Sequence, residues 1–134
     1  MKKSTGKQLF GVILSWIVLI GFIAGTVYYT SNIEFSIDSP VITQVKADGD
    51  SVTIEWKSVP YATSYRVFRR IPGEDWVLLK AVGSSVLSYT DDKADNPQYQ
   101  YSLKSCCSYK DDAIISKFSA ARDIGYSHNK EAVN

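Results

Sequence analysis

The chain has 134 residues, a formal net charge of +1 and 45% hydrophobic residues. A near-zero net charge, without any block of Lys or Arg, argues against a nucleic-acid-binding surface. After an apolar segment near the N-terminus, residues 30–134 suffice for one small domain but not for two.

The first predicted element is an apolar helix over residues 9–29. This run contains no acid or base apart from two tyrosines at its end, and a helix needs about 20 apolar residues to cross a bilayer. Basic residues stay on the cytoplasmic side of a membrane, and three lysines precede the run whereas two acids follow it: Lys2, Lys3, Lys7, Glu34 and Asp38. We therefore expect a single-pass cell-membrane protein with residues 1–8 in the cytoplasm and everything after the helix outside.

The same segment has a competing interpretation as a cleaved signal peptide. Signal peptides have an apolar core of about 7–15 residues followed by small residues, and the core here is longer, so an uncleaved anchor is favoured. Gly21 and Gly25 form a pair of small residues one helical turn apart. Such a pair predicts a weak helix-mediated dimer, although glycine is common in membrane helices in any case.

The remainder of the chain alternates between apolar and polar residues in short segments separated by turn residues such as Asp48-Gly49-Asp50. We expect a linker over 30–39, a charged loop over 109–113 and a polar, frayed tail over 126–134. Seven strands are predicted, which is typical of an all-β antiparallel sandwich. They are Pro40–Ala47, Ser51–Trp56, Ser64–Arg70, Trp76–Val82, Val86–Thr90, Tyr99–Lys104 and one within Ile115–Ile124.

Several sequence motifs narrow this expectation. They are S-V-T-I-E-W in the second strand, A-T-S-Y-R-V-F-R in the third, Trp76 in the fourth, S-Y-T-D, P-Q-Y-Q-Y-S-L in the sixth and S-K-F-S before the last. In this order and spacing, residues 40–125 closely resemble a fibronectin type III domain of the kind found in bacterial surface and secreted proteins. The resemblance implies a seven-stranded immunoglobulin-like sandwich.

The resemblance also implies structural roles for particular residues. Trp56 matches a tryptophan that packs between the two sheets, and Tyr99 matches a corner tyrosine whose hydroxyl bonds to backbone upstream. From the alternation, Tyr65 and Val67 share one face of the third strand, and Tyr101 and Leu103 share one face of the sixth. These side chains are the expected core.

The sequence contains no recognisable catalytic or metal-binding motif. The single histidine, His128, lies in the polar tail, where it cannot be held against a nucleophile. The adjacent Cys106 and Cys107 cannot form an ordinary disulfide with each other, and we expect one buried and one partly exposed thiol. The acid clusters at 48–50, 91–95 and 111–112 belong to separate turns that need not converge on calcium. We expect no enzyme activity and no cofactor.

Two exposed regions are candidate binding sites. Arg66, Phe68 and Arg70 share the outward face of the third strand, next to Lys104 of the sixth, and aromatic and Arg side chains are enriched at interfaces. The alternative is that the Arg stems only cover Phe68. The second region is formed by the loop of Tyr61 and the loop of Tyr109 and Lys110, which this fold brings to one end of the sandwich.

Taken together, the sequence predicts a membrane-anchored, non-enzymatic binding or spacer module outside the cytoplasm, with a protein or another cell-surface component as its partner. A second hypothesis from a different class is a small accessory subunit of a larger membrane complex. In that case the transmembrane helix recruits the partner and the outer domain acts as a cap.

Overall fold

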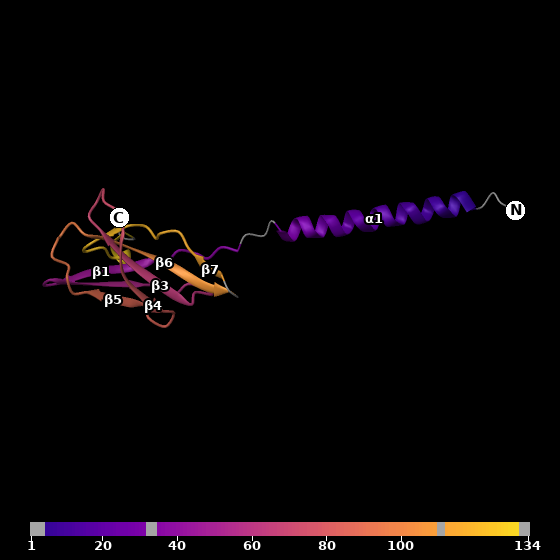
Figure 1. Ribbon diagram of the computed structural model, residues 1–134. Helices are drawn as coiled ribbons and strands as arrows, with labels where there is room; N and C mark the ends of the chain where they lie inside the picture. Colours follow the sequence, from indigo (N-terminus) through magenta and orange to yellow (C-terminus); the bar gives the residue numbers. More distant parts are fainter. Residues whose placement is uncertain (1–4, 32–34, 110–111, 132–134) are drawn as a thin grey trace. The chain divides into compact units, whose positions relative to one another are not determined.

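The computed structural model describes residues 5–31, 35–109 and 112–131. The chain divides into two compact units, residues Met1–Phe35 and Ser36–Asn134 (Figure 1). Each unit is considered by itself.

The first unit contains helix α1 (Thr5–Ser31). Its sequence explains the helix, because residues 8–31 contain neither proline nor any charged side chain. The side chains described in α1, those of residues 11–25, are all exposed. Among the residues that the structure describes, no helix is both long enough and apolar enough to cross a membrane. The membrane span stays a prediction.

The second unit is a sandwich of two antiparallel sheets. Sheet A has the order β1-β2-β5, and sheet B has the order β4-β3-β6-β7, with the short β8 also paired to β6. A tight turn joins β1 to β2, where Gly49 adopts a positive φ of 60° that suits glycine. The bounds are β1 (Ile42–Asp48), β2 (Ser51–Trp56), β3 (Ser64–Arg70), β4 (Val77–Gly83), β5 (Ser88–Asp91), β6 (Gln100–Tyr109), β7 (Asp112–Ile115) and β8 (Arg122–Asp123).

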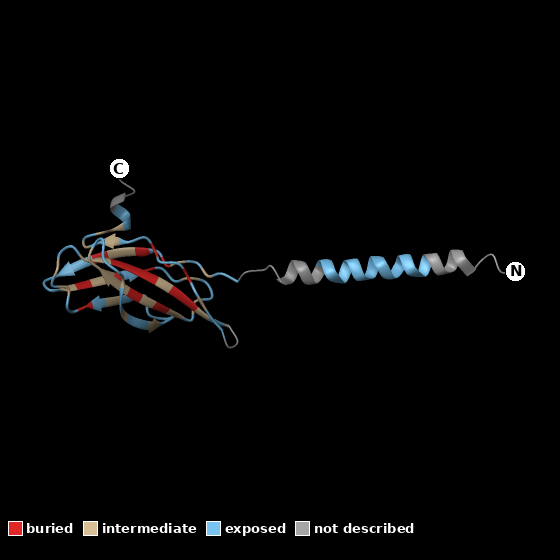
Figure 2. Ribbon diagram, turned by 45° about the horizontal axis from the view of Figure 1, so that its top comes forward, coloured by how far each residue is buried: buried red, intermediate tan, exposed pale blue. Residues whose placement is uncertain are grey.

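The core is formed by buried residues of both sheets, and buried positions recur along the strands of the sandwich, coloured red in Figure 2. Trp56 of sheet A and Tyr65 of sheet B meet edge to face, with ring centroids 5.7 Å apart, a favourable geometry for aromatic pairs. The prediction of Trp56, Tyr65, Val67, Tyr101 and Leu103 as buried core residues is confirmed. The core also includes Ile42, Val45, Val52 and Ile54.

Six predicted strands correspond to β1–β6, but the prediction of seven strands in total is wrong, because the described residues form eight. The segment expected to be a charged loop is a hairpin: β6 continues to Tyr109 and β7 begins at Asp112. Beyond β7 the chain departs from regular pairing with β6 and returns to it as β8. The register shows the irregularity, since Cys106 pairs with Ile115 whereas Tyr101 pairs with Arg122.

Two serine side chains supply hydrogen bonds where the last strand bulges. The backbone N–H of Ser105 donates to Ser116 Oγ at 2.9 Å, and that of Leu103 donates to Ser119 Oγ at 3.0 Å. The hydroxyl of Ser102 donates in turn to the Ser119 carbonyl. The two serine hydroxyls thereby accept from the backbone N–H groups of Leu103 and Ser105, which regular pairing with a neighbouring strand would otherwise satisfy.

The described part of the predicted frayed tail, residues 126–131, is hydrogen-bonded to β1 or helical, and residues 132–134 lie outside the described residues. Helix α2 covers His128–Glu131. The chain before α2 lies along β1: Val45 N–H donates to the Tyr126 carbonyl at 2.9 Å, and Gly125 N–H donates to the Val45 carbonyl at 2.7 Å. The outer edge of β1 is thereby covered.

Candidate binding surfaces

The outer face of sheet B brings together the residues expected there. Arg66 is paired directly with Lys104, and Arg70 with Gln100, in the register of β3 and β6. Directly opposed residues share one face of a sheet, so the cations of the two strands lie next to one another. Phe68 is opposite Ser102, which is buried beneath Ser119 of the bulge.

Stacked aromatic and cationic side chains cover this face. The Trp76 and Phe118 rings stack with centroids 5.4 Å apart, and Phe68 meets the Phe118 ring edge-on at 4.9 Å. The Arg70 guanidinium lies 4.2 Å from the centre of the Trp76 ring, and Lys104 Nζ lies 4.1 Å from that of Phe118. We call Arg66, Phe68, Arg70, Trp76, Lys104 and Phe118 the cationic face.

The ring contacts do not support the alternative that the Arg stems only cover Phe68, because the cation that the structure describes near this ring is a lysine. Lys104 Nζ lies 5.8 Å from the centre of the Phe68 ring, but Arg70 lies over Trp76. Trp76 and Phe118 were not among the predicted site residues. The S-K-F-S motif that carries Phe118 lies in the bulge that brings this ring onto Trp76 and Phe68, but nothing in the motif itself indicates a bulge.

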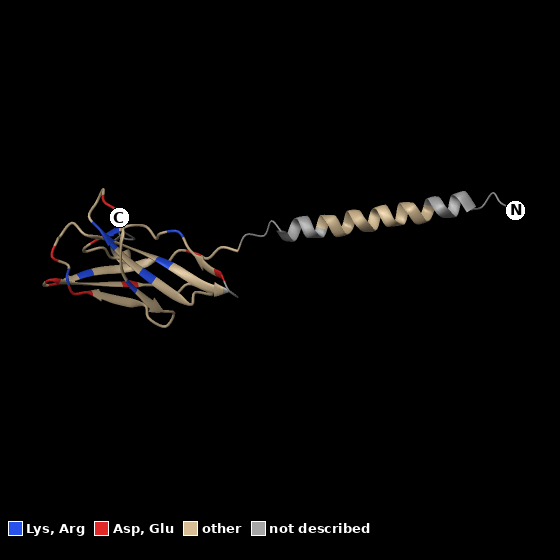
Figure 3. Cartoon of the chain, viewed as in Figure 1, with Lys and Arg blue, Asp and Glu red and all other residues tan. Residues whose placement is uncertain are grey.

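The three long strands of sheet B differ in charge from the strands of sheet A, and the acids of sheet B lie on its short strands, Asp112 on β7 and Asp123 on β8 (Figure 3). Strand β3 carries three arginines, β4 and β6 carry one lysine each, and none of these three strands contains Asp or Glu. The strands of sheet A carry Lys46 together with three acids, Asp48, Glu55 and Asp91. In β3, Arg69 forms an ion pair with Asp91 of sheet A.

Tyr61 is 88% exposed on the loop between β2 and β3 and has a left-handed backbone, with φ of 68°. Such a conformation is uncommon for a bulky residue and is found at functional sites more often than elsewhere. The loop is braced on both sides of it. The Val59 N–H donates to the Tyr65 hydroxyl at 2.9 Å, and the Ala62 N–H donates to the Val59 carbonyl at 3.2 Å.

The Tyr61 loop is hydrogen-bonded to the β6–β7 hairpin. Thr63 N–H and its hydroxyl both donate to the Cys106 carbonyl, and Thr63 Oγ1 accepts a bond from the Ser108 N–H. The two loops expected at one end of the sandwich are therefore adjacent. Tyr109 ends β6, but its side chain lies outside the described residues, as does Lys110 as a whole.

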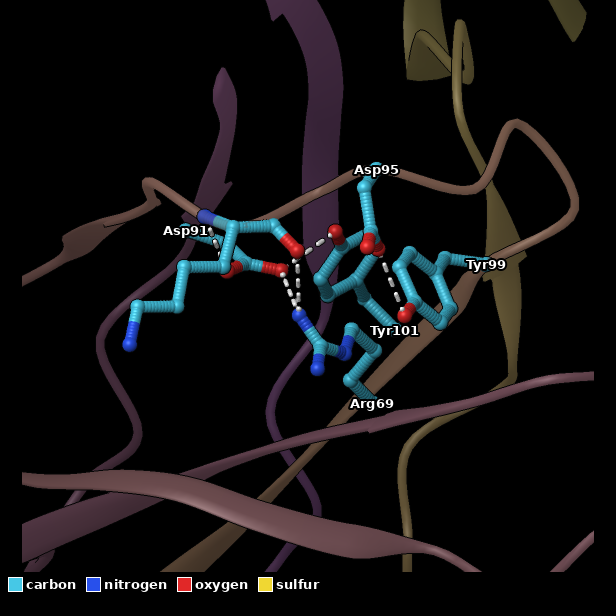
Figure 4. A network of polar contacts seen from close by, with 6 residues as sticks. Arg69, Asp91, Asp95, Tyr99 and Tyr101 are labelled. Atoms are coloured by element: carbon cyan, nitrogen blue, oxygen red, sulfur yellow. Dashed lines mark hydrogen bonds and ion pairs between the residues drawn. The ribbon is translucent and has the colours of Figure 1, made fainter. Parts of the chain in front are cut away.

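A polar network joins the two sheets (Figure 4). The buried Asp91 of β5 accepts a bond from Arg69 at 2.8 Å and another from the Tyr101 hydroxyl at 2.8 Å, both at Oδ2. Its other oxygen accepts the Lys93 N–H. The Arg69 guanidinium also lies 4.2 Å from the centre of the Tyr99 ring. Charge-assisted bonds of this kind fix the relative positions of the two sheets.

The network raises three pKa values. Burial works against the charge of Arg69, but the hydrogen bond and charge of Asp91 outweigh it and raise the pKa of the guanidinium. Burial, followed by the bond to Asp91, raises the pKa of the Tyr101 hydroxyl far above its usual value. The pKa of Tyr99 is also raised, chiefly by its hydrogen bond to Asp95.

The structure corrects one of the predicted structural roles and places the cysteines and the histidine. The hydroxyl of Tyr99 donates to the side chain of Asp95 at 3.0 Å, so the predicted bond to backbone is wrong, and the half-buried ring packs at the margin of the core. Cys106 is buried and Cys107 half-buried, both as free thiols, as expected. His128 is exposed in α2.

Two of the three acidic turns, those at residues 48–50 and 91–95, lie next to each other. Asp50 and Asp95 line a shallow pocket of about 240 Å³, and the Ala94 N–H donates to the Asp50 carbonyl. Among the described residues, no group of three or more His, Cys, Asp or Glu side chains is placed to hold a metal ion.

Comparison with known proteins supports the fold. No protein-family model and no curated protein matches the chain. Among solved structures, the chain is similar to a fibronectin type III-like protein from Clostridium thermocellum, with a TM-score of 0.58 and 20% identity over 69% of this chain and 95% of that one. It is also similar to part of a β-1,2-glucanase from Parabacteroides distasonis, with a TM-score of 0.52 and 16% identity over 72% of this chain and 14% of the enzyme.

At these identities the similarity shows the fold alone. The sandwich formed by residues 36–131 is fibronectin type III-like, and the segment of the glucanase that it resembles is a small part of that enzyme. The predicted fold class is thereby confirmed for the sandwich, apart from the number of strands.

Proposed function

We propose that this protein is a non-enzymatic binding module, held at the outer surface of a cell membrane by α1. The observation that carries the binding role is the end of the sandwich near Tyr61. An aromatic side chain that is almost fully exposed, on a loop braced by Tyr65 and Thr63, loses little conformational freedom when it contacts a partner. The cationic face is the second surface suited to binding.

Membrane anchoring is supported by the sequence of α1. The uncharged run of residues 9–29, preceded by lysines and followed by acids, favours a helix that spans the bilayer with the sandwich outside. Asp38 and Ser39 are already hydrogen-bonded to the sandwich, so the chain between α1 and these contacts, residues 32–37, can extend to about 21 Å at most. A partner would therefore be bound close to the membrane surface.

Photo-crosslinking in intact cells tests the binding role. A photoreactive amino acid in place of Tyr61 should capture a discrete partner, whereas the same amino acid in place of Thr53, on the outer face of sheet A, should not. Replacing residues 9–29 with an unrelated apolar anchor should leave capture at position 61 unchanged. Capture that occurs only through residues 9–29 would support the accessory-subunit hypothesis and contradict the binding role of the sandwich.

Orientation can be tested separately. A cysteine in place of the exposed His128 should react with a membrane-impermeant maleimide in intact cells, with the unmodified chain as the control for reaction of Cys106 and Cys107. Reaction of the new cysteine only after lysis would place the sandwich inside the cell.

A further inference from the structure

We propose that the cationic face binds a short acidic segment of a partner protein. This inference names the chemistry of a partner for the binding role proposed above, and depends on that role only for the existence of the partner in the cell. It rests on unpaired charge, exposed apolar surface and the positions of the surrounding acids.

The first observation is that the cations of this face have no anionic partner among the described residues, although contacts with neighbouring side chains position two of them, Arg70 and Lys104. Arg70 donates from Nε to Gln100 Oε1 at 3.2 Å and lies over Trp76. Lys104 lies over Phe118, and Arg66 is beside Lys104 in the register. Cations that are already positioned bind a carboxylate with little further loss of side-chain freedom.

The second observation is that apolar side chains adjoin these cations. Leu78, near the start of β4, is 51% exposed and is opposite Phe68 in the pairing of β3 with β4. Aromatic and arginine side chains next to exposed apolar surface are typical of protein interfaces. The partner segment should therefore combine acidic residues with apolar ones.

The third observation limits the size of the ligand. Acids surround the cationic face: Glu74 and Asp75 lie in the turn between β3 and β4, and Asp112 is at the start of β7. Asp123 of β8 accepts a hydrogen bond from Gln100 at 2.9 Å, on the side of Gln100 away from Arg70 in the strand order. A bilayer with anionic headgroups or a nucleic acid would extend over these acids and be repelled. A segment of about seven extended residues matches the length of β3, roughly 23 Å, and fits between them.

A second copy of the same chain is disfavoured as the occupant. Placing two cationic faces against each other would bring Arg66, Arg70 and Lys104 of each copy close to the same groups of the other, and facing like charges cost several kcal/mol. The charge of the face therefore favours an acidic partner over self-association.

Fluorescence anisotropy on the full chain in a neutral detergent tests this inference. The probe is a labelled peptide of about seven residues in which Glu and Leu alternate, and its control has Lys in place of every Glu. We expect saturable binding of the Glu peptide that weakens with added salt, and none of the Lys peptide. The Arg66→Glu variant should weaken binding about tenfold. Lys46→Glu, the same change of charge on sheet A, should alter it less than about twofold.

The neutral variant Arg66→Gln should weaken binding of the Glu peptide less than Arg66→Glu does, because it removes an attractive charge without adding a repulsive one. A difference between the two variants therefore reports on charge and not on an effect of the substitution on folding. Equal weakening by Arg66→Glu and Lys46→Glu, or equal binding of the two peptides, would overturn the inference. So would absence of saturable binding, or tighter binding to vesicles containing phosphatidylglycerol or to duplex DNA. If the peptide binds as expected but no partner is crosslinked in cells, the proposed function fails and the acidic-peptide site stands.

Discussion

The two sheets of the sandwich share one core but have different outer faces. Their inner faces contribute similar side chains, such as Val52 and Ile54 from sheet A and Val67 and Leu103 from sheet B. On the outside, Thr53 and Thr90 of sheet A share a hydrogen bond of 3.0 Å, whereas sheet B carries stacked rings and cations. Packing of the core determines which side chains the inner faces can carry. The outer faces are not constrained in this way, so a feature that only one of them has, such as the cationic face of sheet B, is a candidate for a specific binding role.

The edges of the two sheets also differ. On sheet A, the segment around Tyr126 is hydrogen-bonded to the outer edge of β1 at Val45. Sheet B ends at β7 and β8 in a bulged strand whose Phe118 is directed over the sheet and stacks on Trp76. Bulges commonly redirect a side chain in this way. The bulge therefore helps to build the cationic face, in addition to ending the sheet.

The largest expected effect comes from a substitution in the hydrophobic core that the two sheets share. Trp56→Ala, measured by urea unfolding of the fragment 36–134, should lower the free energy of unfolding by about 3–5 kcal/mol, since it removes a large buried ring and leaves a cavity. The fragment itself should unfold cooperatively, because it is a compact unit separate from α1. A fragment without a cooperative transition would contradict the assignment of an autonomous domain.

The next largest effect should come from uncoupling the two sheets at their polar contact. Asp91→Asn keeps the size of the side chain but removes the charge that Arg69 and the Tyr101 hydroxyl contact. We expect a loss of about 1.5–3 kcal/mol, the usual value for hydrogen bonds to a charged group. Asp92→Asn, at the exposed neighbouring residue, is the control and should be close to neutral. Equal effects of the two variants would mean that the network does not hold the sheets together.

A smaller effect should distinguish the outer faces. Phe118 and Leu87 are both 37% exposed, but only Phe118 has stacked rings and a cation around it. Phe118→Ala should therefore lower the free energy of unfolding by about 1–2 kcal/mol more than Leu87→Ala does, because it removes aromatic and cation–π contacts. Thermal or urea unfolding measures both. Equal losses would show that the stack on sheet B adds nothing to stability.

The sequence was sufficient to predict the inner faces and insufficient for the outer ones. Strict alternation in Ser51–Trp56 and Ser64–Arg70 predicted β2 and β3 with their observed bounds, because burial of every second residue is a local signal. The role of Trp56 in the core was implied by the resemblance to fibronectin type III domains, and the alternation of β2 placed it on the same face as Val52 and Ile54. These features depend on residues that are close in sequence.

What could not be predicted depends on residues far apart in sequence. The contact of Trp76 with Phe118 requires the bulge, and the bulge is stabilised by Ser116 and Ser119, whose ordinary composition gave no sign of it. The network around Asp91 likewise joins β3, β5 and β6. Its aspartate belongs to the S-Y-T-D motif, but nothing local indicated that Arg69 and Tyr101 would meet there.

The smallest expected effect is a pH dependence that originates in this network. The pKa of Tyr101 is raised in the folded protein, so the folded state keeps a proton that an unfolded tyrosine loses at a pH of about 10. Above that pH the folded state binds more protons than the unfolded state, and the free energy of unfolding falls as pH rises. Below it, Tyr101 contributes no pH dependence.

Urea unfolding of the fragment 36–134 between neutral pH and a pH of about 11 measures this effect. Tyr101→Phe should be less stable at neutral pH, because it loses the hydrogen bond to Asp91, and should show a shallower decline at alkaline pH. The same variant thus separates the two contributions of one hydroxyl: its bond acts at every pH where it is protonated, and its proton affinity acts only where an unfolded tyrosine would ionise. An alkaline decline as steep as that of the unmodified fragment would show that Tyr101 is not its source.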